Sequence, residues 1–204
     1  MKRATGVTVL PLRHPLITAK QLATLDALSG GRLILGVGVG WLEEEFAALD
    51  VPFAGRGRRH DEYLEAIQRV WATDDASVDH STVTFDGVIS RPKPTTSHVP
   101  IVISGSSTAA ARRAARIVDG FFPGSGNAED LRAILAVLTE ECITQNRDPA
   151  DIEVTVYAGA GTPDQLSTTI EAMLDAGAHR ILLTNEPEAQ LRALVETLHT
   201  RFGR

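Results

Sequence analysis

The stretch with the clearest chemical character is an apolar run that ends in small, aromatic and acidic residues. Residues 33–37 have no polar interruption, as expected of a strand buried on both faces. Glycines at alternate positions, one aromatic residue and three carboxylates close the run: Gly36, Gly38, Gly40, Trp41 and residues 43–45. Glycine N–H groups can approach a ligand that a Cβ would keep away. This loop is therefore a candidate ligand site at the end of a buried strand.

A second interpretation of the same glycines stays open. Their spacing is GxGxG, which is not the dinucleotide-binding fingerprint. Glycines at this spacing can also make one barrel strand narrow and tightly curved. On these residues alone, ligand binding and backbone packing are about equally supported.

A second candidate site follows the apolar segment 99–104. Gly105, Ser106 and Ser107 open a helix expected over residues 109–116. Unpaired N–H groups and the positive end of the helix dipole favour an anion at such a turn, so we predict a phosphate site. The alternative is an ordinary Ser/Thr helix cap.

Other residues of chemical interest have a simpler explanation. The connection 51–60 contains four cationic or near-cationic residues: Arg56, Arg58, Arg59 and His60. They could bind an anion. We favour the alternative that they form a solvated face or pair with the carboxylates at 43–45. Cys142 lies at helical spacing with apolar residues, which predicts packing in the core. The six histidines are scattered without zinc-like spacing, so we predict no metal site.

The composition sets the class of protein. The chain has 204 residues, of which 43% are hydrophobic, and a net charge of -6. This balance predicts one globular domain over residues 1–204 and argues against a general nucleic-acid binder, which needs a basic patch. No apolar run reaches the roughly 20 residues that cross a bilayer. A single cysteine cannot form an internal disulfide, so we expect a cytoplasmic protein that does not bind membranes.

The elements that would position these residues alternate regularly. Strands are expected at 6–10, 33–37, 99–104, 117–122, 154–157 and 181–183, and helices at 15–29, from 61, 109–116, 128–145, from 163 and near the C-terminus. Asp86-Gly87 predicts the two-residue turn of a hairpin inserted between 82–85 and 88–89. The alternation predicts an α/β fold with a parallel sheet. Short strands that are apolar throughout are typical of the wall of a (β/α) barrel. A complete (β/α) barrel needs eight strand–helix units and typically about 250 residues, and this chain supplies six units.

Four segments together resemble the bacterial-luciferase-like superfamily, and most closely its branch of oxidoreductases that use the deazaflavin coenzyme F420. These segments are residues 9–15, 25–32, 36–46 and 119–121. The resemblance implies a TIM barrel with the cofactor at the C-terminal ends of the strands. It also implies that the first two βα units of the barrel have no counterpart here, and with them the family's acid/base candidates.

The resemblance implies roles for individual residues. Thr8 and Val9 match the place where relatives hold a strained, often cis, peptide behind the ring of the cofactor. Gly38, Gly40 and Glu44 match the loop over the ribityl side, and Trp41 would wall the pocket. Gly105, Ser106 and Ser107 match the phosphate grip. His14 and Glu44 are candidate catalytic residues; His14 and Arg13 would orient substrate, unless His14 only bonds local backbone as a turn residue.

The implied reaction is hydride transfer between F420 and a small organic substrate, in a protein expected to be a homodimer. Two alternatives stay open. One is a luciferase-like monooxygenase that uses FMN. The other is a chain without catalysis of its own, either a truncated fragment or a barrel completed by a partner chain, because unpaired strand edges seek partners.

Overall fold

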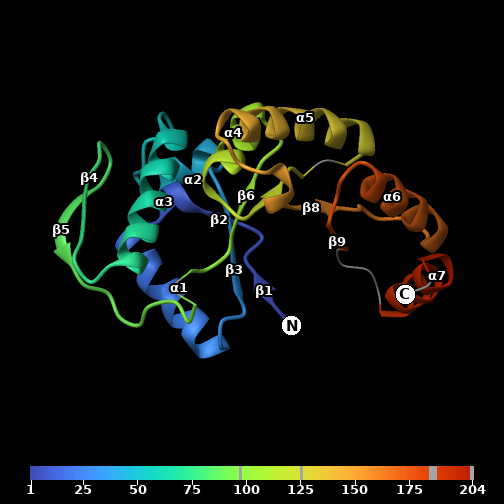
Figure 1. Cartoon of the computed structure of the whole chain (residues 1–204), viewed down its shortest axis with the longest axis horizontal. Helices are drawn as coiled ribbons and strands as arrows, with labels where there is room; N and C mark the ends of the chain where they lie inside the picture. Colours follow the sequence, from blue (N-terminus) through green and yellow to red (C-terminus); the bar gives the residue numbers. More distant parts are fainter. Residues whose placement is uncertain (97, 125, 184–187, 203–204) are drawn as a thin grey trace. The chain divides into compact units, whose positions relative to one another are not determined.

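The computed structural model describes residues 1–96, 98–124, 126–183 and 188–202. The chain divides into two compact units, Met1–Val102 and Ile103–Arg204 (Figure 1). Each unit combines parallel strands with helices. The α/β class predicted from the alternation of elements is therefore confirmed. The single domain over residues 1–204 stays a prediction.

The sheet of the first unit is built around β3 (Leu33–Gly38), in which all six residues are buried. Two short strands, β1 (Arg3–Ala4) and β2 (Thr8–Val9), pair with it in parallel. On the other side, the Leu35 N–H donates to the carbonyl oxygen of Pro100 at 2.8 Å, just before β6 (Ile101–Ser104). The strand expected at 6–10 is thus shorter, because the chain turns into the 3₁₀ helix η1 (Leu10–Leu12).

Three helices cover this sheet: α1 (Pro15–Ser29), α2 (Glu43–Ala48) and α3 (Arg56–Ala72). Helix α1 begins at Pro15 and ends at Gly30, which takes the left-handed conformation (φ 68°), as its sequence predicts. Helices α1 and α3 lie side by side (Figure 1), and the Trp71 indole N–H donates to the Ala19 carbonyl at 3.0 Å.

The sequence misplaced one helix start and missed one helix. Helix α3 begins at Arg56 rather than at Asp61. Its first turn carries arginines and glycine, so the apolar stripe that reveals the helix starts only later. Helix α2 is six residues long and falls in the segment expected to be a loop. A helix this short has too few turns to show an apolar period.

The inserted hairpin is present, but its turn was predicted at the wrong place. Strand β4 (Ala76–Asp79) pairs antiparallel with β5 (Thr84–Val88), and the His80 N–H donates to the Val83 carbonyl across the turn. Asp86 and Gly87 lie inside β5, where the register shifts. Gly87 has a φ of 61°, and its N–H donates to the Ser77 hydroxyl. The left-handed glycine therefore makes a β-bulge instead of the turn.

The second unit continues the strand–helix alternation. The Gly105 N–H joins the end of β6 to the Phe122 carbonyl of β7 (Gly120–Phe122) at 3.0 Å. Strand β7 pairs in parallel with β8 (Glu153–Tyr157), and β8 pairs in parallel with β9 (Arg180–Leu182). The helices are α4 (Thr108–Ile117), α5 (Ala128–Thr144), α6 (Pro163–Asp175) and α7 (Glu188–Phe202).

The core of the second unit includes the cysteine, as predicted. Leu131, Val154 and Met173 form part of one buried cluster between α5, α6 and β8. Cys142 of α5 is fully buried, and this burial raises the pKa of its thiol. The residue therefore packs as a small apolar side chain. Among the helices that the structure describes, none is long and apolar enough to span a bilayer.

Candidate functional site

The first unit contains a cleft of about 870 Å³. Five consecutive residues line it, together with the start of the following turn and one face of α2: Thr5, Gly6, Val7, Thr8, Val9, Leu12, Arg13, Glu45, Ala48 and Leu49. Residues 5–9 line the cleft without a gap, so this segment forms one of its walls.

A non-proline cis peptide bond lies within this segment, between Gly6 and Val7. We expected it at Thr8–Val9, and this placement was wrong by two residues. Thr8 and Val9 are instead regular parallel partners of Val37 and Gly38.

One glycine leaves the cleft open. A Cβ built on Gly6 would have no protein atom within 4 Å, although Gly6 lines the cleft. A side chain at this position would therefore occupy space that a ligand could use. Sequence analysis missed Gly6, because a single glycine in a short strand has no distinctive spacing.

The alternating glycines Gly36, Gly38 and Gly40, at the end of β3 and just after it, have a different role. A Cβ on Gly36 would lie 2.1 Å from the Thr5 carbonyl oxygen. Gly40 has a φ of 79°, and its Cβ would lie 2.7 Å from Val9 and 2.8 Å from Phe46. Both glycines are required because the protein's own atoms pack against them. The packing interpretation thus accounts for Gly36 and Gly40, whereas Gly38 stays a predicted ligand contact at the end of β3.

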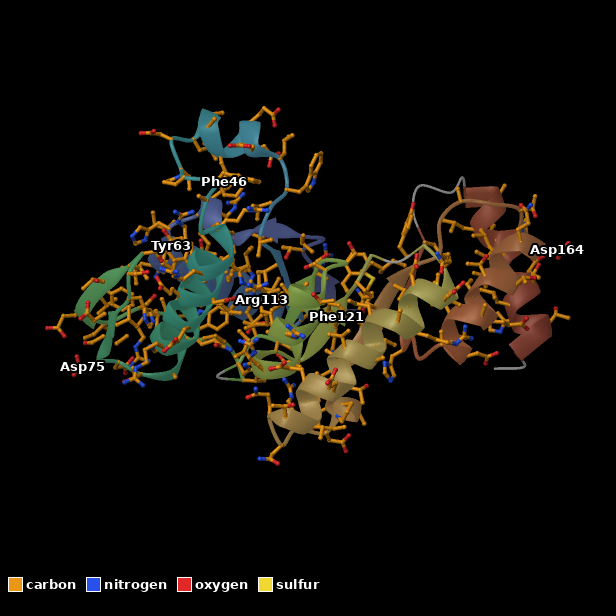
Figure 2. The ribbon with its side chains drawn as sticks, turned by 90° about the horizontal axis from the view of Figure 1, so that it is seen from above. Phe46, Tyr63, Asp75, Arg113, Phe121 and Asp164 are labelled. Carbon is orange, nitrogen blue, oxygen red and sulfur yellow. The ribbon has the colours of Figure 1, made fainter. Side chains whose placement is uncertain are left out.

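The loop that follows is fixed by side chains of the same unit. Phe46 of α2, labelled in Figure 2, has no exposed surface. Its ring meets the Phe53 ring edge-to-face, with ring centroids 5.2 Å apart. The Arg56 guanidinium lies 3.8 Å above the Phe53 ring, and its Nε donates to the Gly40 carbonyl at 3.0 Å. Arg59 donates to the Pro52 carbonyl at 2.7 Å. Arg56 and Arg59 thus bond to neighbouring parts of the chain, in line with the local pairing that we favoured over anion binding. Their partners are backbone carbonyls rather than carboxylates.

Neither Trp41 nor Glu44 of this loop is among the residues that line the cleft. Trp41 exposes 82% of its surface, and Glu44 is also exposed. The carboxylate that lines the cleft belongs to Glu45. A wall at Trp41 and a cofactor contact at Glu44 therefore remain predictions, and Glu45 is a further candidate that sequence analysis missed.

His14 lies at the N-terminus of α1. Its Nδ1 accepts a hydrogen bond from the Leu16 N–H at 3.3 Å, so the side chain caps the helix. This contact is the local backbone bond considered as the alternative to substrate binding. In the neutral imidazole the proton is then on Nε2, which is the atom left to donate to a ligand.

The second unit has its own cleft, of about 530 Å³, at the N-terminus of α4. Hydroxyls, small residues and one face of α5 line it: Ser106, Thr108, Pro123, Gly124, Gly126, Asp130, Ala133, Ile134 and Val137. The predicted grip at Gly105, Ser106 and Ser107 is only partly accessible. The Gly105 N–H donates to the Phe122 carbonyl. The Ser107 hydroxyl accepts a hydrogen bond from the Ala110 N–H as an ordinary helix cap.

What remains at this turn is a set of backbone donors. Within the described part of the chain, the N–H groups of Thr108 and Ala109 have no acceptor. Ser106 is exposed and lines the cleft. Backbone donors and a helix dipole favour an anion here. The donors are therefore shifted by a few residues from the predicted set.

Among the residues that the structure describes, no group of three or more His, Cys, Asp or Glu side chains could hold a metal ion.

Comparison with known proteins gives both sequence and structural relatives. An uncharacterized protein of Mycobacterium tuberculosis is 37% identical over 130 residues, which are 64% of this chain and 44% of the relative. The FMNH2-dependent dimethylsulfone monooxygenase of Pseudomonas putida is 34% identical over 123 residues, which are 58% of this chain and 34% of that enzyme. The chain thus spans less than half the length of these two relatives.

The fold likewise matches that of a solved enzyme. The coenzyme F420-dependent tetrahydromethanopterin reductase of Methanopyrus kandleri superposes with a TM-score of 0.84 and 18% identity, covering 97% of this chain and 81% of the reductase. The predicted TIM-barrel-type α/β fold is thereby confirmed. The sequence profile of the luciferase-like monooxygenase family matches residues 1–160. Since this match covers most of the chain, the protein belongs to the luciferase-like monooxygenase family, a family of enzymes.

Proposed function

We propose that the protein is an oxidoreductase that transfers a hydride between coenzyme F420 and a small organic substrate. The observation that carries this proposal is the cleft of the first unit, which residues 5–9 line without a gap and in which Gly6 leaves room for a flat ring. Family membership and the likeness to an F420-dependent reductase support the same cofactor class.

The residues present fit such a cofactor. The segment from Gly6 to Val9 would hold one face of the ring, with Gly38 at the end of the paired strand β3. Within the second unit, the N–H groups of Thr108 and Ala109, with the Ser106 hydroxyl, are by themselves candidate donors for a phosphate. The deazaflavin supplies the redox chemistry when bound, and the protein supplies orientation and exclusion of water.

The substrate would lie on the side of the cleft formed by Arg13 and Glu45. The Arg13 guanidinium offers donors for a carbonyl or an anionic group of the substrate. His14 would donate from Nε2, because Nδ1 is occupied by the Leu16 N–H. Neither candidate catalytic residue, His14 or Glu44, is among the residues that line the cleft, so both remain candidates without a contact to it.

FMN is the alternative cofactor, favoured by the likeness to an FMNH2-dependent monooxygenase. Its ring would need the same wall of the first unit's cleft, formed by residues 5–9. Fluorescence titration of the purified protein with F420 and with FMN separates the two proposals. Gly6→Val should abolish binding of the preferred cofactor by filling the cleft. Ala150→Val, which adds bulk at an exposed position outside both clefts, should bind like the unchanged protein.

We further propose that the protein acts in the cytoplasm as a homodimer. The outer face of α1 supports an interface, since Ile17 and Leu28 expose 61% and 80% of their surface. Light scattering on the purified protein should give a dimer, and Leu28→Lys should shift it to a monomer. Soluble aggregates from the unchanged protein would instead support the alternative of a truncated chain without catalysis.

A further inference from the structure

We infer that Thr5 is a positioning residue, whose hydroxyl holds the segment from Gly6 to Val9 in place as a wall of the cleft. The inference rests on the proposed function for the use of that wall. It concerns a residue that neither the spacing of the motifs nor the family match distinguishes.

The pairing of the edge strands with β3 is interrupted at this point. Ala4 pairs with Ile34, and the next pair is Thr8 with Val37. The edge therefore advances four residues while β3 advances three, so the edge carries one residue more. Such a bulge disrupts the ladder locally and leaves backbone groups of the opposite strand without their regular partners.

The Thr5 side chain supplies the missing partner. Its hydroxyl accepts a hydrogen bond from the Gly36 N–H at 2.9 Å and donates one to the Gly36 carbonyl at 2.8 Å. The Thr5 N–H donates to the Ile34 carbonyl at 3.2 Å. Thr5 thus satisfies three backbone groups of β3 across the break. Two of these bonds are made by its hydroxyl, and no apolar side chain can replace them.

The contact is also close in space. A Cβ on Gly36 would lie 2.1 Å from the Thr5 carbonyl oxygen, so the backbones of these two segments are in direct contact. Thr5 is followed at once by the cleft-lining residues Gly6 and Val7. A shift of Thr5 must therefore move the wall of the cleft. Thr5 also lines the cleft, but its hydroxyl makes both Gly36 bonds, so we assign Thr5 a positioning role.

The test compares Thr5→Val, which keeps the shape and removes both hydroxyl bonds, with Thr5→Ser, which keeps the hydroxyl. Thr197→Val is the matched control, because it removes a half-buried hydroxyl bond to the Ala193 carbonyl in the second unit. All variants are titrated with F420 and FMN at a temperature at which each is fully folded. Amide hydrogen exchange of Gly36 is measured in the cofactor-free proteins.

We expect Thr5→Val to weaken cofactor binding about tenfold or more, the scale of one or two lost hydrogen bonds. Thr5→Ser should stay within about threefold of the unchanged protein, and Thr197→Val should not differ from it. Exchange of the Gly36 N–H should accelerate in Thr5→Val and be restored in Thr5→Ser.

Unchanged cofactor affinity in Thr5→Val, with or without a lower melting temperature, overturns the inference. So does Gly36 exchange that stays equally slow in Thr5→Val. If the unchanged protein binds neither cofactor, the proposed function fails instead, and the exchange of Gly36 alone then decides whether Thr5 holds the segment.

Discussion

Two strand-to-helix connections of this protein are both rich in small residues but differ in what those residues contact. In the first unit, Gly36 near the end of β3 and Gly40 just after β3 pack closely against Thr5, Val9 and Phe46. After β6, in the second unit, Ser106 is exposed, and the N–H groups of Thr108 and Ala109 have no acceptor in the described part of the chain. Small residues thus allow the chain to pack on itself in one connection and keep backbone donors accessible in the other.

The difference shows what a glycine-rich loop does and does not reveal. In the first unit the glycine that opens space for a ligand is Gly6, which lies outside the conspicuous GxGxG. In the second unit the glycine of the turn, Gly105, uses its N–H in the sheet. In both units, groups available to a ligand therefore lie outside the residues that the spacing singled out: Gly6 in the first unit, and the N–H groups of Thr108 and Ala109 in the second.

The largest effect is expected for Gly36→Ala. The new Cβ would lie 2.1 Å from a backbone oxygen, so the strands must separate. We expect the free energy of unfolding to fall by at least about 3 kcal/mol, measured by urea denaturation. Gly126→Ala is the control, because its Cβ meets no atom within 4 Å. A cost equal in the two variants would show that β1 and β3 adjust freely.

The next effect tests whether side chains fix the connection after β3. Arg56→Ala removes the bond to the Gly40 carbonyl and the contact with the Phe53 ring. We expect a loss of roughly 1–2 kcal/mol in urea denaturation. Arg56→Lys should recover only part, because an ammonium lacks the planar stacking group. The exposed Arg58→Ala serves as control, and a similar loss there would assign the effect to charge alone.

The third effect separates two serines of the connection after β6. Ser107→Ala removes a helix cap and should lower the free energy of unfolding by about 1 kcal/mol. Ser106→Ala should change stability by less than about 0.5 kcal/mol but weaken binding of the phosphorylated cofactor. Urea denaturation and cofactor titration of both variants check this. If Ser106→Ala destabilises as much as Ser107→Ala, the two hydroxyls share a structural role.

The smallest effect concerns how the hairpin is attached to α3 in the first unit. The Glu62 carboxylate accepts bonds from the Ser81 hydroxyl at 2.7 Å and from the Thr82 N–H at 2.8 Å. Partial burial raises the pKa of Glu62, but the hydrogen bonds from Thr82 and Ser81 outweigh it and hold the pKa below its ordinary value of 4.5. The ionised carboxylate therefore stabilises the folded state above that ordinary value. This contribution is lost as the pH falls through the lowered pKa.

Glu62→Gln should accordingly cost roughly 0.5–1 kcal/mol at pH 7 and less at pH 3. The measurement is urea denaturation of both proteins at each pH. Glu140→Gln is the matched control, since the Glu140 side chain accepts no hydrogen bond in the described structure. A cost for Glu62→Gln that does not shrink in acid would show that the ionised form is not what holds the hairpin.

Much of the fold follows from short-range patterns. The apolar run predicts β3, and Pro15 and Gly30 predict both ends of α1. Patterns of this kind fail where the same residues suit two structures. Asp86-Gly87 fits a hairpin turn as well as a bulge, and only the pairing of β5 with β4 selects the bulge. At Arg56, α3 begins in a turn without apolar residues, so periodicity does not reveal its start.

The sequence by itself determined the family, the α/β class and the two connections at which a ligand is expected. Only the tertiary structure decided which atoms in those connections are accessible. Thr5 and Gly36 are 31 residues apart in the chain, and their contact fixes both the need for one glycine and the wall of the cleft. Local sequence records conformational preference, whereas the close approach of two distant backbones arises only when β1 and β2 pair with β3.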